Sequence, residues 1–267
     1  MTARTHLKGH KRIVVKVGTT TLTYPSGKLN YQRIEKICLV LSDLCNQGKE
    51  MILVTSAAIA VGMDCLRLEE RPRDIFGKQA TSAVGQAMLM QIYQRFFSLY
   101  NRQIAQILLT RDVLDNPLRA QNARNTIDTL INMGVVPIVN ANDSIATEEL
   151  DEISDNDTLS AHVAVLSDAD LLIMLSDIEG LYNADPKNAP QAAFYYEVHT
   201  ITPEMESCAG GAGSNLGTGG MATKLHAAQM AMEHDMEAMI ASGEDPEVVW
   251  RILQGEQIGT LFTKGRD

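Results

Sequence analysis

The sequence contains few of the residues that mark several common classes of protein. Its cysteines are Cys38, Cys45, Cys65 and Cys208, and their scattered positions include no paired metal-ligand spacing. It contains no run of about 18 apolar residues that could span a membrane, and no apolar signal segment. We therefore expect a protein of the reducing cytoplasm that does not enter a membrane. We also expect no zinc site among its cysteines or its 6 histidines.

Basic residues are also scarce. Lysine and arginine together number 23, against 33 aspartates and glutamates, which gives a formal net charge of −10 at pH 7. A protein that binds nucleic acid needs a basic face to neutralise phosphates, so we expect no nucleic-acid partner. The one short basic cluster extends from His6 to Arg12, and we interpret it as a solvated N-terminal tail.

The apolar residues alternate between strand-like and helix-like patterns. With 267 residues, of which 45% are hydrophobic, the chain can bury a large core in one domain or in two closely joined lobes. Short β-branched runs alternate with amphipathic segments, which predicts an α/β fold with a mostly parallel sheet. The expected strands cover residues 13–18, 51–55, 104–109, 135–139, 171–175, 238–241 and 259–262, and the expected helices cover residues 30–47, 79–100 and 225–234, with one more that ends near residue 134.

Lys16 lies inside the first expected strand, immediately before Val17 and Gly18. A lysine in a buried strand is costly unless its ammonium group emerges at the strand end beside anions, and a following glycine lets backbone N–H groups approach a ligand closely. The pattern is therefore typical of a phosphate cradle. A lysine that extends along the edge of the sheet into solvent explains the pattern equally well.

The most glycine-dense segment covers residues 210–224 and leads into an expected helix. Part of it fits a dinucleotide-binding fingerprint, but no strand precedes these glycines, which excludes that interpretation. A flexible linker does not explain Lys224 in the first helical turn, where its charge opposes the helix dipole. A loop that delivers Thr218, backbone amides and Lys224 to a triphosphate fits the pattern better.

Asp155, Asn156 and Asp157 lie side by side before apolar residues that recur at helical spacing. Such side chains either cap the helix or hold another group in position, such as lysines or a magnesium ion. On this stretch alone the cap interpretation is favoured. Because Lys16 and Lys224 lie at separate glycine-bearing anion sites elsewhere in the chain, the whole sequence favours the second interpretation.

The sequence contains no G-x-x-x-x-G-K-[ST] motif, so it does not predict a P-loop enzyme. Phosphoryl transfer needs mainly positioning and neutralisation of charge. Two lysines, a magnesium ion and backbone amides could supply both without a protein nucleophile. Phosphoryl transfer is therefore the reaction that the residues favour.

Six ordered motifs resemble those of the amino acid kinase family, and within it the glutamate 5-kinases. The resemblance covers nearly the whole chain, and the last motif together with the Asp-Asn-Asp segment separates it from the acetylglutamate, aspartate, carbamate and uridylate kinases. The motifs are Val15–Thr19, Val54–Ile59, Asn140–Asp143, Asp155–Ala161, Ser176-Asp177 with Gly180–Tyr182, and Gly217–Lys224.

The resemblance implies a three-layer sandwich of helices around a mostly parallel sheet. It also implies ATP-dependent phosphorylation of the side-chain carboxylate of L-glutamate, the first step of proline biosynthesis. One amino acid kinase domain would span residues 1–267, with a glutamate-binding lobe at about 1–166 and a nucleotide-binding lobe at about 167–262. Mg²⁺ would accompany ATP, and no protein side chain is assigned to the metal.

The resemblance also assigns residues to roles. Lys16 and Lys224 would flank the transferring phosphate, and Asp157 would orient both lysines. The expected glutamate contacts are Ser56, Asp143 and Asn156. The expected nucleotide contacts are Lys16, Ser176, Asp177, Thr218, Gly219, Gly220, Met221, Ala222, Thr223 and Lys224.

The sequence departs from the family pattern at a few positions. Ala57 stands where a glycine is usual and Ala141 where a glutamate is common, and one extra residue separates Asp143 from Asp155. We expect a slightly tighter phosphate loop and a less acidic glutamate pocket. Family members usually form dimers or tetramers and are inhibited by proline, and we expect both here, without the C-terminal PUA domain that many members carry.

The sequence leaves two alternative functions open. A relative that acts on N-acetylglutamate or aspartate would keep the same phosphate-binding residues. A catalytically silent nucleotide sensor would keep the fold for binding alone. The presence of Lys16, Lys224 and Asp157 disfavours the sensor.

Overall fold

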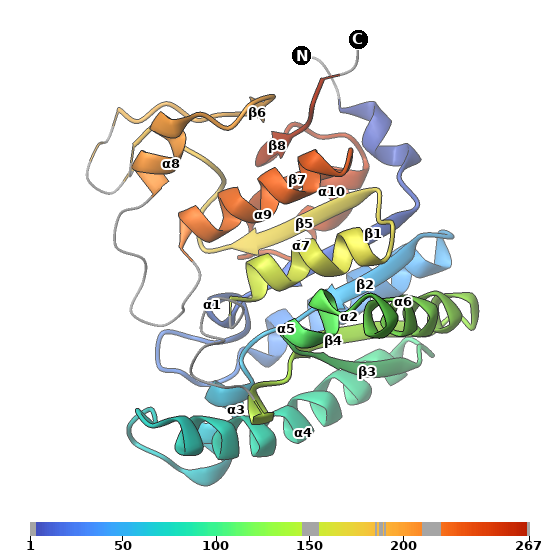
Figure 1. Ribbon diagram of the computed structural model, residues 1–267, viewed down its shortest axis with the longest axis vertical. Helices are drawn as coiled ribbons and strands as arrows, with labels where there is room; N and C mark the ends of the chain where they lie inside the picture. The colour runs from blue at the N-terminus through green and yellow to red at the C-terminus, as the bar shows by residue number, and fades with distance from the viewer. Residues whose placement is uncertain are drawn as a thin grey trace.

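The computed structural model describes residues 4–145, 155–184, 186, 189, 191–209 and 220–265. Within these residues one sheet of eight strands crosses the molecule in the order β3-β4-β2-β1-β5-β7-β8-β6 (Figure 1). Neighbouring strands are parallel except β7 and β8, which are antiparallel. The strands are β1 (Arg12–Val17), β2 (Glu50–Val54), β3 (Ile104–Leu109), β4 (Val136–Ala141), β5 (Leu171–Ser176), β6 (Glu197–Val198), β7 (Glu237–Ser242) and β8 (Thr260–Phe262).

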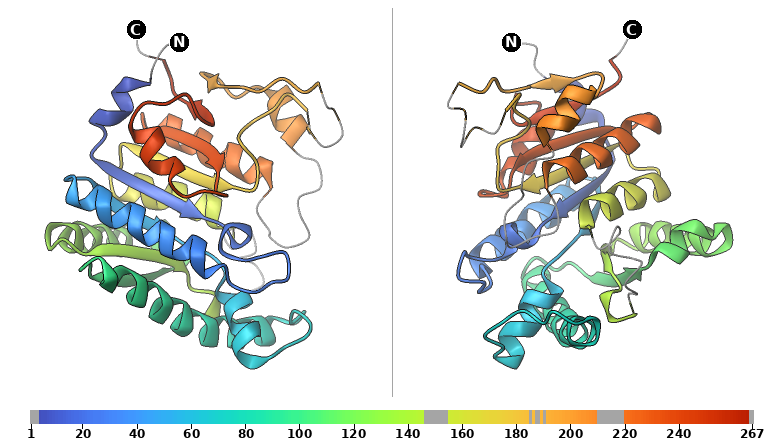
Figure 2. Two further views of the ribbon diagram at one scale, coloured as in Figure 1. Left: turned by 180° about the vertical axis from the view of Figure 1, so that it is seen from behind. Right: turned by 60° about the vertical axis from the view of Figure 1, so that its left-hand side comes forward.

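Helices cover both faces of this sheet. Along β1, Ile13, Val15 and Val17 join one hydrophobic core, whereas Val14 joins the other, as the alternation of side chains in a strand requires. The first core includes apolar residues of α2, α4 and α10, and the second includes those of α6, α7 and α9. Figure 1 looks onto the layer of α6, α7 and α9, and Figure 2 (left) looks onto the opposite layer. The predicted three-layer sandwich is confirmed.

The helices begin where the sequence supplies capping residues. Asn30 accepts a hydrogen bond from the backbone of Arg33 at the start of α2, and Asp74 does the same for Gly77 at the start of α4. Asp74 therefore starts α4 a few residues earlier than the apolar pattern predicts. The helices are α1 (Thr19–Leu22), α2 (Tyr31–Asn46), α3 (Ala58–Leu66), α4 (Ile75–Leu99), α5 (Arg111–Asp115), α6 (Pro117–Asn132), α7 (Asn156–Leu166), α8 (Pro203–Ala209), α9 (Met221–Glu233) and α10 (Val248–Leu253), with 3-10 helices η1 (Thr5–Gly9) and η2 (Asp143–Ile145).

The basic run near the N-terminus is not a solvated tail, and that prediction is wrong. The run forms η1 and the start of β1, and Leu7 within it is fully buried in the first core. His6 and His10 both contact the carboxylate of Glu237 at the start of β7. These histidines are four residues apart, a pairing that the expectation of no zinc site overlooked.

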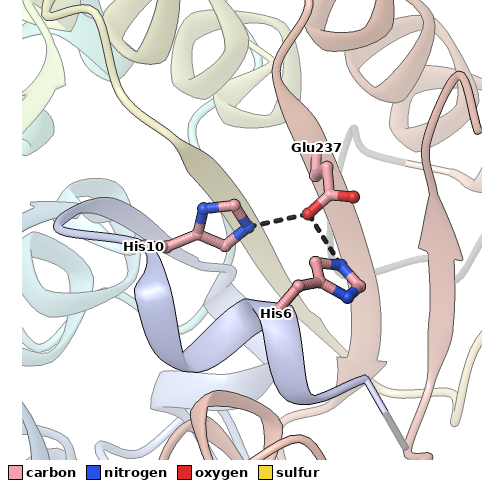
Figure 3. Close-up of side chains that lie close together, drawn as sticks. All are labelled: His6, His10 and Glu237. Atoms are coloured by element: carbon pink, nitrogen blue, oxygen red, sulfur yellow. Dashed lines mark hydrogen bonds and ion pairs between the residues drawn. The ribbon is translucent and has the colours of Figure 1, made fainter. Parts of the chain in front are cut away.

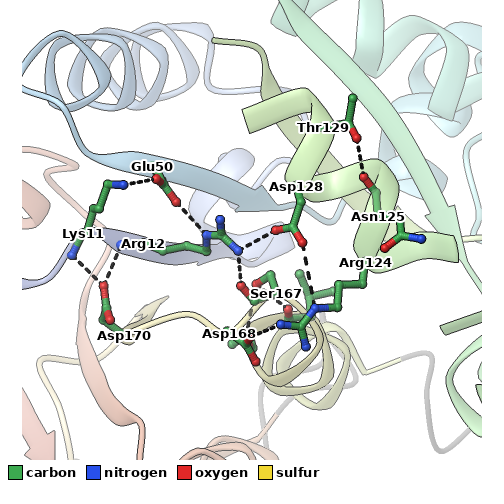
Figure 4. A network of polar contacts seen from close by, with 12 residues as sticks. Lys11, Arg12, Glu50, Arg124, Asn125, Asp128, Thr129, Ser167, Asp168 and Asp170 are labelled. Carbon is green, nitrogen blue, oxygen red and sulfur yellow. Dashed lines mark hydrogen bonds and ion pairs between the residues drawn. The ribbon is translucent and has the colours of Figure 1, made fainter. Parts of the chain in front are cut away.

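Arg12 joins several elements at the amino end of the sheet (Figure 4). Its Nε donates to Glu50 Oε2 of β2 at 2.8 Å, and its Nη1 donates to Asp128 Oδ1 of α6 at 2.7 Å. Its backbone N–H donates to Asp170 Oδ2, at 2.7 Å, just before β5. The half-buried guanidinium donates to two carboxylates at once, and the backbone N–H donates to a third. This network therefore fixes the amino end of β1 between β2 and β5.

The order of the strands places a switch point at β1. The strands on the β2 side of β1 come from the chain up to Ala141, and those on the β5 side come from Leu171 onward. In open α/β sheets, ligands bind beyond the carboxyl ends of the strands where the strand order reverses. The carboxyl ends of β1, β2 and β5 therefore mark where a site is expected. None of the described helices combines the length and apolar character that crossing a membrane would need.

Candidate active site

Lys16 lies one residue before the end of β1. It pairs in register with Val54 of β2 and Met174 of β5, so its backbone is central in the sheet. Only 4% of the residue is exposed. A buried ammonium group needs anionic partners, because its desolvation is otherwise very costly.

Asp157 supplies the anionic partner of Lys16. One carboxylate oxygen, Oδ1, forms an ion pair with Lys16 Nζ, and the Asp157 side chain is fully buried. Asp157 lies on the first turn of α7, but it does not cap the helix. Asp155 is the cap, because its carboxylate accepts hydrogen bonds from the backbone N–H groups of Asp157 at 3.2 Å and Thr158 at 3.4 Å. The carboxylate of Asp157 is therefore available to the lysines.

Lys224 approaches the same carboxylate from α9. Its Nζ donates to Asp157 Oδ2 at 2.9 Å, and its side chain is only 8% exposed. The hydroxyl of Thr223 donates to the same oxygen at 3.0 Å. The structure therefore brings together three residues that lie far apart in the sequence, Lys16, Asp157 and Lys224, and these are the residues that the family resemblance groups around the phosphate.

The charges of these residues set the protonation state of Asp157. Burial alone would raise its pKa, but the ammonium groups of Lys16 and Lys224 lower the pKa to about 2. Asp157 is therefore ionised at neutral pH. One negative charge lies between two positive charges, so the group carries a net charge of +1 that a bound anion can neutralise.

A second set of polar contacts links the end of β2 to the start of α7. Asn156 Nδ2 donates to Ser56 Oγ at 2.8 Å, whereas Asn156 Oδ1 is buried and has no hydrogen-bond partner among the described residues. Ala57, which follows Ser56, has φ 75° and ψ 11°, a left-handed conformation that favours glycine. This conformation fits the glycine that the family resemblance leads us to expect at that position. An unpaired buried acceptor is costly, so Asn156 is ready to receive a donor from a ligand.

Asp143 contacts α4. Its carboxylate accepts a hydrogen bond from Ser82 Oγ at 3.3 Å. Burial raises the pKa of Asp143, and the hydrogen bond from Ser82 and the charge of Arg71 only partly oppose that rise. Ser82 was not predicted, because a serine in the middle of a helix has no local pattern that marks it as a partner of Asp143. The long helix α4 packs against both α3 and η2, so it fixes Ser56 and Asp143 relative to one another.

Apart from Lys16 on β1, the predicted nucleotide-binding residues that the structure describes lie at the end of β5 and at the start of α9. Ser176 Oγ donates to Asp177 Oδ1 at 3.2 Å, just beyond the strand. Gly220 precedes α9 and supplies no side-chain cap, and Met221 and Ala222 form the first turn. The first N–H groups of α9 are thus without a side-chain acceptor in the part of the chain that is described, which suits an anion. The predicted contacts Thr218 and Gly219 lie outside the described residues.

The geometry suits phosphoryl transfer. Two cations and one uncapped helix start meet beyond the carboxyl ends of β1 and β5, and a carboxylate holds the cations close together. Such preorganised positive charge stabilises the negative charge that develops on a transferring phosphoryl group. The site does not bring a serine, cysteine or histidine nucleophile into hydrogen-bond contact with these described lysines.

Sequence comparison identifies the family. The model of the amino acid kinase family matches residues 11–242, which is most of the chain. The chain belongs to the amino acid kinase family. It is 54% identical to the glutamate 5-kinase of Clostridium perfringens over 97% of both chains. It is 51% identical to that of Listeria monocytogenes serotype 4b over 99% of this chain and 97% of the relative, and 48% identical to that of Enterococcus faecalis over 98% of both.

Solved structures of two other kinases have a similar fold. The UMP kinase of Bacillus anthracis superimposes with a TM-score of 0.62 at 18% sequence identity, and 96% of this chain and 97% of that chain are covered. An isopentenyl phosphate kinase superimposes with a TM-score of 0.64 at 16% sequence identity, and the superposition covers 94% of this chain and 100% of that chain. At such low identity the likeness concerns the fold alone, and it agrees with the amino acid kinase fold predicted from the motifs.

Proposed function

We propose that this protein transfers the γ-phosphoryl group of ATP to the side-chain carboxylate of L-glutamate, which gives glutamyl 5-phosphate in the first step of proline biosynthesis. The observation that carries the proposal is the 48% to 54% identity to glutamate 5-kinases over nearly the whole chain. The group of Lys16, Asp157 and Lys224 supports it independently, because it provides the charges that phosphoryl transfer requires.

In this mechanism the protein positions charges and does not remove a proton. The attacking carboxylate of glutamate is already ionised near neutral pH, so no general base is needed. Lys16 and Lys224 flank the transferring phosphoryl group and stabilise the charge that develops on its oxygens. Asp157 orients both ammonium groups and keeps their mutual repulsion small. Asp157 is thus a positioning residue.

We assign the glutamate site to Ser56, Asp143 and Asn156. The unpaired Oδ1 of Asn156 and the carboxylate of Asp143 are acceptors, and the free ammonium group of glutamate is a donor of matching charge. N-acetylglutamate lacks that charge and adds an acetyl group, so it leaves these acceptors poorly paired. The arrangement therefore favours glutamate over its N-acetylated form.

We assign ATP to the start of α9 and the end of β5. Ser176, Asp177 and the segment from Thr218 to Lys224 form this half of the site in the proposal. Mg²⁺ is expected to arrive with the nucleotide as part of the substrate, because magnesium retains waters and binds mainly through substrate phosphates in such sites. Both oxygens of Asp157 already contact lysines, so Asp157 is unsuited to be the metal ligand.

The test is an assay that couples ADP release to a measured signal. Glutamate, N-acetylglutamate and aspartate are compared at equal concentrations with Mg-ATP. We expect turnover with glutamate and little with the other two. Equal turnover with N-acetylglutamate or aspartate would assign the chain to another substrate, and nucleotide binding without any turnover would favour the sensor.

The relationship to the family also supports proposals about the lobes, the oligomeric state and the inhibition of this protein. We propose one domain, with a glutamate lobe at about residues 1–166 and a nucleotide lobe at about 167–262, which agrees with the division of the sheet at β1. We also propose a dimer or tetramer that is inhibited by proline at the glutamate site. The described cysteines are free thiols, and we propose the reducing cytoplasm as the compartment.

A further inference from the structure

Two histidines and a glutamate converge at the amino end of β7, far from the lysines of the active site. Figure 3 shows His6 and His10 from the η1 segment, with both rings directed at the carboxylate of Glu237. Glu237 is the first residue of β7, and Ser242 at the other end of β7 pairs with Ser176. The strand separates the two ends by about 17 Å at the usual rise per residue. The cluster is therefore distinct from the active site.

The three ligand-type atoms lie close enough together to share one metal ion. The Nε2 atoms of His6 and His10 lie 3.2 Å and 2.7 Å from Glu237 Oε2, and one ligand atom from each of the three residues falls within 4.8 Å of the others. In a tetrahedral zinc site, bonds of about 2.0–2.1 Å place neighbouring ligand atoms roughly 3.3 Å apart. The His6 contact already has this spacing, and the His10 contact must lengthen by about half an ångström, which a side-chain rotation can provide.

The surroundings leave these atoms available. The side chains of His6, His10 and Glu237 are 27%, 14% and 12% exposed, so the cluster is largely enclosed but retains a route from solvent. Thr263 forms a side-chain hydrogen bond with Glu237, which helps to fix the carboxylate. Arg4 also interacts electrostatically with Glu237, but its guanidinium donates to backbone carbonyls, including that of Ile258 at 2.6 Å.

We propose that His6, His10 and Glu237 form a binding site for a divalent transition-metal ion of the zinc type, with water as the fourth ligand. Two imidazoles and one carboxylate are a ligand set that zinc accepts, whereas magnesium and calcium favour sites made of oxygen atoms. The metal of this site is thus chemically different from the Mg²⁺ that accompanies ATP.

The bound ion links two segments that are far apart in the sequence. It joins η1, at the beginning of the described chain, to β7, near its end. An ion that binds only the folded arrangement stabilises that arrangement by mass action. The site has a structural role in this proposal, because its position at the amino end of the sheet is remote from the transferring phosphate.

The experiment measures metal binding by the full chain and does not depend on activity. The protein is stripped with a chelator, and Co²⁺ is added in the presence of excess Mg²⁺, which occupies sites made of oxygen atoms. We expect one saturable equivalent with visible absorption typical of low coordination number, and without the near-ultraviolet band of cobalt–thiolate bonds. Zn²⁺ should displace the cobalt and raise the melting temperature.

Two variants and one matched control decide whether this cluster is the site. His6→Gln should weaken binding by about tenfold or more, because it removes an imidazole nitrogen, and Glu237→Gln should do the same, because it replaces a charged carboxylate with a neutral amide. His6 is the most exposed of the three residues, so His6→Gln should remain folded, which circular dichroism checks. His234→Gln changes an exposed histidine whose Nδ1 contacts only the carbonyl of Met230 among the described contacts, and it should bind the metal as the parent does.

Three results would overturn the proposal. One is that Co²⁺ and Zn²⁺ produce no saturable change in the parent protein. Another is equal binding by the parent and by folded His6→Gln. The third is a thiolate band that disappears when the exposed Cys65 and Cys208 are replaced by serine, because the metal would then be held by cysteines and His6, His10 and Glu237 would form only a hydrogen-bonded cluster.

Discussion

Asp155 and Asp157 are two residues apart on one helix start, yet their carboxylates have different partners. Asp155 accepts hydrogen bonds from backbone N–H groups, whereas Asp157 contacts Lys16 and Lys224. From the sequence, both are good capping residues, and only the spatial position of the two lysines separates their roles. The same chemical substitution at the two positions should therefore have different consequences.

Asp157→Asn should reduce turnover by roughly a hundredfold, because the lysines lose the charge that orients them. It should also lower the free energy of unfolding by about 3 kcal/mol, since two buried cations then lack their counter-ion. Asp155→Asn is the matched control and should keep both properties near the parent's values, because asparagine caps helices as well as aspartate does. Steady-state kinetics and urea denaturation measure the two effects. Equal behaviour of the two variants would show that Asp157 is only part of the helix start.

The pH dependence of stability should also identify Asp157. Its pKa is lowered from 3.8 to about 2 in the folded protein, so its stabilising contribution is complete above pH 3.8 and is lost as the pH falls toward 2. The contribution amounts to about 2 kcal/mol. In urea denaturation, the gap between parent and Asp157→Asn should narrow only below about pH 4. A gap that already closes between pH 7 and 5 would contradict this assignment.

Lys224→Ala should act mainly on the turnover number. The ammonium group stabilises charge that develops during transfer, so its loss should lower kcat by roughly two to three orders of magnitude, with a smaller change in KM for ATP. Lys264→Ala is the control, because Lys264 is an exposed lysine that pairs with Asp235 at 2.7 Å. A rise in KM for ATP with unchanged kcat would make Lys224 a binding residue only.

Replacement of Ala57 with glycine should stabilise the folded protein. Its left-handed backbone costs a residue with a Cβ roughly 1–2 kcal/mol, and glycine removes that cost while adding some entropy to the unfolded chain. We expect Ala57→Gly to raise the free energy of unfolding by about 1 kcal/mol. Ala58→Gly, at the first residue of α3, should have the opposite sign because its backbone is helical. A destabilised Ala57→Gly variant would mean that the alanine methyl group contributes more by packing than its backbone conformation costs.

At the scale of elements, α3 and α4 pack with almost no space between their backbones. A Cβ atom added at Gly85 of α4 would collide with the carbonyl oxygen of Ala58, and one added at Gly62 of α3 would collide with the carbonyl of Thr81. These glycines therefore set the distance between the two helices. Because Ser56 immediately precedes α3, this distance also affects the glutamate site.

Gly85→Ala should consequently displace α3 and the residues before it. We expect the free energy of unfolding to fall by about 1–3 kcal/mol, as at other overpacked positions. Relative to the parent, the KM for glutamate should rise more than the KM for ATP. Gly9→Ala serves as the control, because a Cβ added there meets no atom within 4 Å. If KM for both substrates rose equally, the effect would be a general loss of the fold and would not be specific to α3.

The sequence predicted the long and strongly patterned elements well. β3 was predicted at its observed ends from its apolar run. The predicted bounds of α2 differ from the observed ones by one residue, because its apolar residues recur at the right period and Asn30 and Gly48 bound the segment. α1, α3, α5, α8, α10 and β6 were not predicted, since they are short, and α3 begins at an alanine without a side-chain cap. The packing of these short elements decides their conformation.

The active site could be predicted from the sequence only in part. Lys16 stands beside a strand end and Lys224 at a helix start, so local pattern could single out both lysines, whereas only the family resemblance separated Asp157 from Asp155. Ser82 could not be found in this way, because its role depends on the packing of α4 against η2.

At the scale of the whole molecule, the position of β1 in the sheet has a consequence for synthesis of the chain. β1 is made early and can pair with β2 as soon as that strand is complete, but its other edge waits for β5. Lys16 likewise waits for Asp157, and Lys224 is added later still, on α9. A nascent chain on the ribosome therefore has an unpaired strand edge and an unneutralised lysine at its centre until well past its midpoint. This order leaves the backbone groups at one edge of β1 open to pairing with other chains during synthesis, and it delays phosphate binding by both lysines together until synthesis is nearly finished.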